Sequence, residues 1–143
     1  MITRYHNLII SLACRIIVPF ILLFGIYIIL FGHYSPGGGF QGGTILAAGV
    51  ILTRLVLGKK ATYKKFPPQL GLILGAIGLL IYGGTGMVAL LAGGNFLDYS
   101  FLPIPGIESA ERRYYGILFV EIGVALGVFG VLLSIFDGLS KEK

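Results

Sequence analysis

Charged side chains are scarce in this chain of 143 residues, since Asp, Glu, Lys and Arg together make up only 12% of it. An average soluble domain carries about 25% charged residues. So few charges cannot cover a folded surface that faces water, which excludes an ordinary soluble protein. The hydrophobic residues, at 56% of the chain, predict a protein that lies in a lipid bilayer.

Cysteine is nearly absent as well. The single cysteine, Cys14, excludes an internal disulfide and any site in which several cysteines bind a metal or an iron–sulfur cluster. We expect Cys14 to be a small buried apolar residue. The apolar segments also lack a nucleophile–base pair, a metal-binding cluster and a cofactor fingerprint, so we expect no catalytic residues, no metal and no cofactor.

Long segments of the chain lack charge altogether. Residues 16–53 and 66–97 contain no Asp, Glu, Lys or Arg, and residues 114–136 contain only Glu121. Each exceeds the roughly 20 residues that cross about 30 Å of hydrocarbon as a helix. The first would span roughly 57 Å as one helix, so it must fold back on itself. The sequence therefore predicts four membrane-spanning helices, at residues 8–31, 41–57, 70–92 and 115–136.

These spans predict an all-α fold, a single membrane domain over residues 1–143 that forms a bundle of four helices. Only helices and closed barrels satisfy every backbone group in lipid, and the alternating pattern of a barrel strand is absent. The first span is longer than the apolar part of a secretion signal and lacks a small-residue cleavage site. We therefore expect this span to remain in the mature protein.

The basic residues predict the orientation of the bundle. Four lysines lie in the short connection between the second and third spans: Lys59, Lys60, Lys64 and Lys65. Such a cluster is typical of a cytoplasmic loop under the positive-inside rule. Both termini then lie inside, and residues 32–40 and 93–114 lie outside. Because membrane topology accounts for the net charge of +5, we expect no nucleic-acid partner.

Glycines recur at helical spacing in the third and fourth spans. Gly71 and Gly75 form one GxxxG pair, and Gly123 and Gly127 form another. Glycine at this spacing lets membrane helices approach closely. The pairs predict close helix packing, either within this one bundle or against partner subunits. Four short helices have few mutually buried faces, which favours partner subunits.

Glu121 is the carboxylate that a lipid-facing helix does not explain. It lies about 8–9 Å into the fourth span from the outer end, and a carboxylate is too short to reach far toward the headgroups. We therefore expect it to face protein or a water-filled cavity. At about 100° per residue it points roughly 200° away from Gly123. Two roles are open for Glu121, a position on a proton or cation path and a hydrogen bond to a partner helix.

The most distinctive segment joins the first two spans. It reads Gly32-His33-Tyr34-Ser35-Pro36-Gly37-Gly38-Gly39-Phe40-Gln41-Gly42-Gly43, so six of its twelve residues are glycine. Glycine permits positive φ and close backbone approach, so the chain can dip back toward the membrane here, with a plain tight turn as the alternative. A phosphate-binding loop is excluded, because no Lys and Ser/Thr follow the glycines. His33 is a second candidate for the ion path because histidine titrates near neutrality, and an interfacial hydrogen bond is its alternative role.

This motif, with the following Thr44-Ile45-Leu46-Ala47-Ala48-Gly49, resembles the MnhB family, whose members are the B component of Mrp-type multisubunit sodium/proton antiporters. The resemblance covers most of the chain, including the four-helix layout and the long 93–114 connection. It implies a non-catalytic, multi-pass subunit in the cell membrane. Its implied partners are other small membrane subunits and large antiporter-like subunits, with which it helps to translocate sodium or protons. The complex would be either a free-standing antiporter or a redox-driven complex of the membrane-bound hydrogenase or sulfur-reducing type.

Two other functions stay open at this point. The chain is either a self-sufficient four-helix transporter that works as a homodimer, or a purely structural packing subunit. Small multidrug exporters of the first kind depend on a carboxylate in their first span, where this chain has Arg15 and no Asp or Glu. A packing subunit would leave Glu121 unexplained. Both features count in favour of the ion-translocation subunit.

Overall fold

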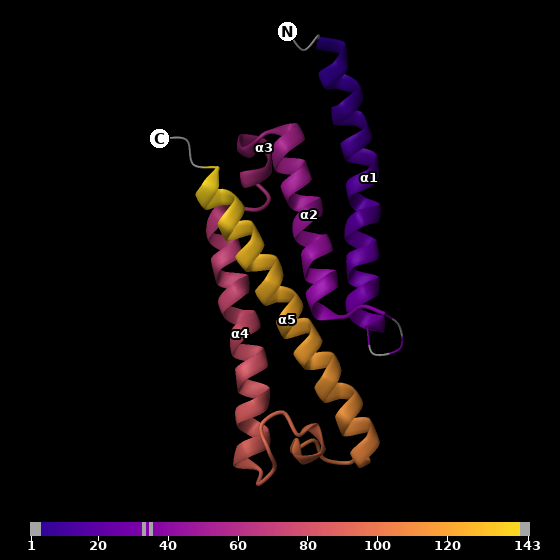
Figure 1. Cartoon of the computed structure of the whole chain (residues 1–143), viewed down its shortest axis with the longest axis vertical. Coiled ribbons are helices and arrows are strands. Elements are labelled where there is room, and N and C mark those ends of the chain that lie inside the picture. The colour runs from indigo at the N-terminus through magenta and orange to yellow at the C-terminus, as the bar shows by residue number, and fades with distance from the viewer. Residues whose placement is uncertain (1–3, 33, 35, 141–143) are drawn as a thin grey trace.

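The computed structural model describes residues 4–32, 34 and 36–140 and shows an all-helical chain (Figure 1). Within that part of the chain, four helices are long and apolar enough to cross a membrane: α1 (Arg4–Phe31), α2 (Gly39–Leu57), α4 (Pro68–Leu91) and α5 (Ser109–Leu139). Two short elements lie in the connections, α3 (Lys59–Tyr63) and the 3-10 helix η1 (Tyr99–Phe101). The predicted all-α fold with four membrane helices is confirmed.

The helices differ from the predicted spans at their ends. α2 begins at Gly39 rather than at residue 41, so part of the glycine motif is itself helical. α5 begins at Ser109 rather than at residue 115, and its first turns contain Arg112 and Arg113. An apolar run identifies only the part of a helix that suits hydrocarbon. The helix itself can extend into water, because its backbone hydrogen bonds do not depend on the polarity of the side chains. The sequence pattern therefore underestimates the length of α5.

Glycine and proline set several helix ends. Pro68 occupies the first position of α4, where its missing N–H removes no helical hydrogen bond. α4 ends in a Schellman motif, because the N–H of Gly94 donates to the carbonyl of Ala89 at 3.0 Å and that of Gly93, with φ 91°, to the carbonyl of Leu90 at 3.0 Å. These ends fix where the connections leave the bundle.

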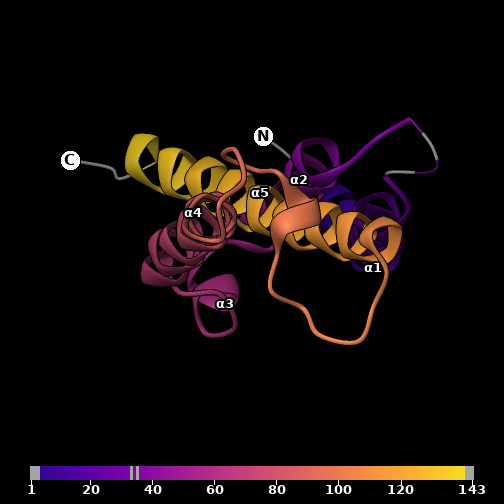
Figure 2. The same ribbon diagram turned by 90° about the horizontal axis from the view of Figure 1, so that it is seen from below.

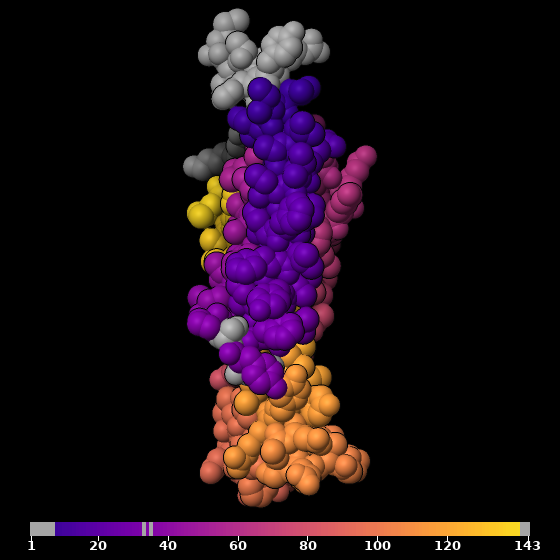
Figure 3. All heavy atoms as spheres, turned by 90° about the vertical axis from the view of Figure 1, so that its right-hand side faces the viewer, coloured from indigo at the N-terminus to yellow at the C-terminus, as the bar shows by residue number. Residues whose placement is uncertain are grey.

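The helices lie in the order α1, α2, α5, α4 across the bundle. α5 runs diagonally through the molecule and packs against α2 on one side and α4 on the other (Figures 1 and 2). α1 packs mainly on α2 and covers one outer face, beyond which the start of α5 and the preceding connection project (Figure 3). The start of α1, α3 and the end of α5 lie at one end of the bundle (Figure 1). Which side of the membrane that end faces stays a prediction.

The core lies between α2 and α5. Its buried side chains are Ala47 and Val50 of α2 and Phe129 and Leu133 of α5, with Leu133 only 1% exposed. The outer faces of α1 and α4 instead expose large apolar side chains such as Leu12, Phe20, Leu72 and Leu79. Such faces suit lipid or neighbouring membrane helices.

The glycines of α4 and α5 face each other. A methyl group added to Gly130 would lie 2.2 Å from the carbonyl oxygen of Gly71, and one added to Gly78 would lie 2.3 Å from the backbone nitrogen of Gly127. A methyl on Gly123 would lie 3.1 Å from the Gly78 oxygen. At Gly75 the nearest atom would be 3.8 Å away, and Gly127 itself has nothing within 4 Å. At the closest of these positions the glycines permit packing within this chain.

Candidate functional site

Glu121 lies where the turn between α1 and α2 meets α5. A methyl group built on Gly32 would lie 3.0 Å from Glu121 Oε1, and one built on Gly38 would lie 3.3 Å from the same atom. One built on Gly39 would lie only 2.2 Å from the backbone carbonyl oxygen of Glu121. Gly38 also has a φ of 143°, which residues with side chains rarely adopt. Glycine at these positions therefore lets the turn contact both the side chain and the backbone of Glu121.

This turn is recessed along the bundle axis. Glu121 lies roughly 18 Å along α5 from Ser109, at about 1.5 Å per residue. The start of α5 and the connection at residues 92–108 project beyond the ends of α1 and α2 (Figures 1 and 3). Non-helical backbone at membrane depth is tolerated only against protein or water, and here the turn lies against α5. The recess places Glu121 at the level of the turn rather than at the outer end of the molecule.

The start of α2 is an electropositive neighbour for the Glu121 carboxylate. Gly38 is the N-cap residue of α2 and provides no side-chain hydrogen bond, and the first turn of α2 contains no acidic residue. The partial positive charge of a helix N-terminus attracts a nearby anion. When ionised, the Glu121 side chain complements the start of α2, which gives this carboxylate a structural contact as well as a candidate role in ion movement.

Tyr99, in the connection between α4 and α5, lies near the same region. It packs on α5 at Gly116, where an added methyl group would lie 2.7 Å from Tyr99 Cβ. Burial raises the pKa of Tyr99, and the neighbouring Tyr82 and the negative charge of Glu121 raise it further. The phenol therefore stays protonated at neutral pH and remains a hydrogen-bond donor.

His33 lies outside the described residues, so its place on an ion path stays a prediction. Its neighbour Tyr34 is described, and the ring of Tyr34 lies with its centroid 6.4 Å from that of Tyr114 on α5. Tyr114 precedes Glu121 by about two helical turns and so lies on the same face of α5. The turn therefore follows the face of α5 that carries Glu121.

Inward from Glu121, α2 and α5 run side by side in the same direction. Gly39 meets Glu121, and about one turn further along both helices Gly43 meets Ala125, because a methyl group on Gly43 would lie 2.5 Å from the Ala125 carbonyl oxygen. Two backbones that approach this closely leave no room for side chains between them. We call this α2–α5 contact, from Gly39 and Glu121 to the helix ends at Arg54 and Asp137, the seam.

The middle of the seam is apolar. Four buried side chains fill it: Ala47, Val50, Phe129 and Leu133. Apolar packing offers a charged group nothing to replace its hydration. These four residues therefore do not connect the two ends of the seam by a polar route.

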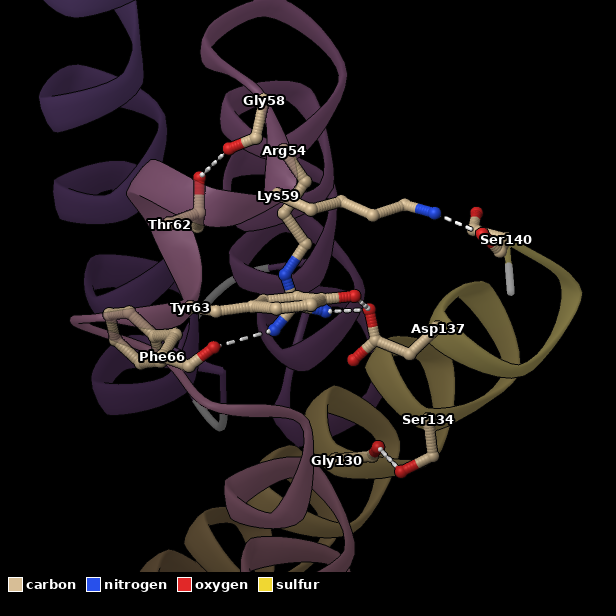
Figure 4. A network of polar contacts seen from close by, with 10 residues as sticks. All are labelled: Arg54, Gly58, Lys59, Thr62, Tyr63, Phe66, Gly130, Ser134, Asp137 and Ser140. Carbon is tan, nitrogen blue, oxygen red and sulfur yellow. Dashed lines mark hydrogen bonds and ion pairs between the residues drawn. The ribbon is translucent and has the colours of Figure 1, made fainter. Parts of the chain in front are cut away.

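A second polar cluster lies at the other end of the seam, which we call its inner end because the basic residues predict that it faces the cytoplasm (Figure 4). Arg54 Nη1 donates to Asp137 Oδ1 at 2.6 Å, and this ion pair is buried, with Arg54 2% and Asp137 4% exposed. Tyr63 Oη donates to the same oxygen at 3.1 Å. Arg54 Nη2 donates to the carbonyl of Phe66 at 3.0 Å. The pair joins α2 to α5, and α3 and the turn after it cover the pair.

α3 contributes further contacts to this cluster. The guanidinium carbon of Arg54 lies 5.2 Å from the centre of the Tyr63 ring, which is within cation–π range. Burial raises the pKa of Tyr63, and its hydrogen bond to Asp137 raises it further, so the phenol stays a donor at neutral pH. Lys59 Nζ donates to the carbonyl of Ser140 (Figure 4). Tyr63 and Lys59 thus hold α3 to the end of α5.

Two polar atoms of the ion pair make no hydrogen bond within the described part of the chain. These atoms, Arg54 Nε and Asp137 Oδ2, are both buried. Removing two charges from water is costly, and an incompletely bonded pair offsets that cost poorly. Such a pair is a weak source of stability, and fixing the register of two helices is the better attested role of buried polar groups.

The two carboxylates of α5 lie far apart. Glu121 and Asp137 are separated by roughly 24 Å along the helix, at about 1.5 Å per residue. Among the residues that the structure describes, no three His, Cys, Asp or Glu side chains come together in a way that could hold a metal ion. Each end of the seam therefore carries one carboxylate, with different surroundings.

The Arg54–Asp137 pair was missed by reasoning from the sequence. Arg54 lies in the last turn of α2 and Asp137 just beyond the predicted end of the fourth span, where single charges are typical of a membrane surface. The two residues are 83 positions apart, so no local pattern joins them. The available signal was that opposite charges fall at the same predicted end of two spans.

Comparison with known proteins shows similarity over almost the whole chain. A family model described as "Domain related to MnhB subunit of Na+/H+ antiporter" matches residues 9–134. The matched range includes the glycine motif and Glu121, whereas Asp137 lies just beyond it.

Individual relatives agree with this match. The B component of a Na(+)/H(+) antiporter from Bacillus subtilis (strain 168) is 33% identical, with 98% of this chain and 97% of that protein aligned. The protein of the same name from Alkalihalophilus pseudofirmus is 31% identical, with 97% and 96% aligned. "Putative antiporter subunit mnhB2" of Staphylococcus haemolyticus is 30% identical, with 98% and 99% aligned.

Proposed function

This chain belongs to the MnhB family, and from that premise we propose that it is a membrane subunit of an Mrp-type sodium/proton antiporter complex. Relatives that align over nearly its full length are named as antiporter subunits. Its four apolar helices suit a multi-pass protein of the cell membrane. Its work is therefore ion transport within a larger complex, not a bond-making reaction of its own.

Within that complex, Glu121 contributes a carboxylate to the ion path. The observation that supports this role is the contact between Glu121 Oε1 and the recessed glycine turn, at Gly32 and Gly38. A carboxylate inside a membrane helix is costly and commonly serves ion or proton movement. Within the glycine motif, from Pro36 to Gly43, Gly38 and Gly39 place backbone rather than their own side chains beside Glu121.

Neighbouring subunits complete the path. The apolar middle of the seam provides no polar route from Glu121 to the inner end. A cation that reaches Glu121 must therefore continue along a surface that this chain shares with another subunit. The exposed apolar faces of α1 and α4 suit contact with lipid and with such partners, which we take to be small membrane subunits and large antiporter-like subunits.

The bundle is oriented with α3 and both termini toward the cytoplasm. Lys60, Lys64 and Lys65 are exposed at the α3 end, where the positive-inside rule places such residues. Glu121 then lies in the outer half of the membrane.

The test is sodium-dependent proton flux in vesicles that contain the whole complex, with wild type compared with Glu121→Gln. Glutamine keeps the size of the side chain and removes its charge and its titration. The matched control is Glu111→Gln, which makes the same change at an exposed position of the same helix. We expect Glu121→Gln to abolish flux while the complex stays assembled, and Glu111→Gln to leave flux unchanged.

Unchanged flux in an assembled Glu121→Gln complex would instead make the chain a packing subunit whose carboxylate serves the start of α2. A third outcome concerns the chain alone. Flux in vesicles that contain only this purified chain would support a self-sufficient homodimer and contradict the subunit proposal.

A further inference from the structure

We propose that the buried Arg54–Asp137 pair sets the register of α2 on α5 and thereby positions the glycine turn at Glu121. Arg54 and Asp137 are positioning residues in this proposal, acting roughly 24 Å from the carboxylate that they affect. The consequence for transport rests on the proposed role of Glu121. The consequence for the position of the turn does not.

Packing at the Glu121 end of the seam opposes a one-turn slip only through small residues. Gly39 and Gly43 are spaced by about one helical turn, and each already accepts the α5 backbone without a side chain between. A slip of one turn, about 5.4 Å, would bring Gly43 to Glu121. The same slip would bring Ala47 to Ala125, where a Cβ lies 2.5 Å from the Ala125 carbonyl oxygen, so a single methyl group opposes it.

The polar pair at the inner end does select one register. Its hydrogen bond joins Arg54 Nη1 and Asp137 Oδ1 at 2.6 Å, and both side chains are almost fully buried. A slip of about 5.4 Å exceeds the range of any hydrogen bond. It would leave an unpaired buried cation and an unpaired buried anion, which is strongly unfavourable. The observed register is the one in which these charges meet.

Arg54 cannot follow such a slip by changing its side-chain conformation. Its Nη2 donates to the Phe66 carbonyl at 3.0 Å, and the Tyr63 ring lies against its guanidinium. Tyr63 itself donates to Asp137 Oδ1 at 3.1 Å. Figure 4 shows Arg54 of α2 and Tyr63 of α3 meeting the Asp137 carboxylate, while the Phe66 carbonyl, from the turn that follows α3, meets the Arg54 guanidinium. The pair is therefore held from both helices and from the connection between α2 and α4.

The contacts at the start of α2 depend on the register of α2 on α5. Gly38 and Gly39 contact the side chain and the backbone of Glu121 only in the observed alignment. If α2 shifts or loosens, the turn moves away from the carboxylate and exposes it differently to lipid and water. A change at Arg54 and Asp137 is therefore expected to alter the reactivity of Glu121 at the far end of the seam.

The experiment measures labelling of Glu121 in the intact complex by dicyclohexylcarbodiimide, an apolar reagent for protonated carboxyl groups, with the modified peptide quantified by mass spectrometry. The main variant is Arg54→Met/Asp137→Leu, since replacing a buried ion pair by apolar residues is often tolerated. The matched control is Arg15→Met, which removes an exposed arginine from α1. Arg54→Lys retains a positive charge opposite Asp137 and tests rescue.

We expect the labelling rate of Glu121 to change several-fold in the double variant, with sodium-dependent proton flux reduced and assembly retained. Arg15→Met should match wild type in both measurements. Arg54→Lys should lie closer to wild type than the double variant does. A purely local structural role for the pair would change thermal stability and leave Glu121 labelling unaltered.

Unaltered labelling in an assembled double variant would overturn the register proposal. If the double variant does not assemble, Arg54→Met alone decides, because it removes the cation and its hydrogen bond to Asp137 while Tyr63 still donates to Asp137; wild-type labelling there would also overturn the proposal. Altered labelling together with normal flux in Glu121→Gln would uphold the register and refute the ion-path role of Glu121. The experiments can therefore refute the register role of the ion pair and the ion-path role of Glu121 independently of each other.

Discussion

Replacing Gly39 with alanine should force α2 and α5 apart at Glu121. The added methyl group would lie 2.2 Å from the Glu121 carbonyl oxygen, 2.9 Å from the carbonyl carbon and 3.1 Å from Cα. A carbon–oxygen contact needs roughly 3.3 Å, so the helices must separate by about 1 Å. All three atoms are helix backbone, and no side chain can rotate away to make room.

The energy of this change follows from two opposing effects. Overpacking typically costs about 1–3 kcal/mol, and an all-backbone clash belongs at the upper end of that range. Alanine is favoured over glycine in a helix by no more than about 1 kcal/mol. We therefore expect a net destabilisation of about 1–2 kcal/mol. We expect flux to fall even at temperatures where the complex remains folded, because the displaced turn no longer contacts the Glu121 carboxylate.

The assay is thermal inactivation of the purified complex, followed by flux measured well below the inactivation temperature. Gly83→Ala is the matched control, since it adds the same methyl group to a helical glycine of α4 that has nothing within 4 Å. That control should be as stable as wild type or slightly more so. A Gly39→Ala complex that equals the Gly83→Ala complex in both stability and flux would refute the close α2–α5 contact.

Two further predictions concern the packing of α5. Gly130→Ala should weaken the α4–α5 contact, because its methyl group would lie 2.2 Å from the Gly71 oxygen. Gly127→Ala should be tolerated, because its methyl group would have nothing within 4 Å. Equal thermal inactivation of the two variants would contradict this prediction. Asp137→Leu alone should cost about 3–5 kcal/mol by leaving the buried Arg54 unpaired, and adding Arg54→Met should recover most of that loss. A double variant that inactivates at a lower temperature than the single one would show that the pair contributes more than compensation of charge.

The sequence predicted the direction in which Glu121 points on its helix. Helical spacing predicted that Glu121 points away from Gly123. In the structure an added methyl on Gly123 would meet Ile81 of α4 at 2.9 Å, whereas Glu121 lies against the α1–α2 turn. A helix has fixed geometry, so the relative direction of two residues on it follows from their separation. Which neighbour lies in each direction does not.

The extent of the helices was less predictable. The charged residues Glu111, Arg112 and Arg113 ended the apolar run, and α5 nevertheless continues through them to Ser109. The outer connection is therefore shorter than the 93–114 segment predicted from hydropathy. The same lengthening of α5 makes the α1–α2 turn recessed relative to the outer end of the bundle.

The sequence by itself determined that four segments prefer lipid, that glycines and Pro36 turn the chain between the first two, and that Glu121 lies within an apolar helix. These properties depend only on residues that are close together in the sequence, so they can be inferred without knowing the fold. The tertiary structure alone decided that α2 lies beside α5 in one register, that Gly39 meets Glu121, and that Arg54 meets Asp137 across 83 positions. Such contacts depend on the separation of two helices in space, and an isolated charge at a helix end has the same sequence signature whether it faces water or a buried partner.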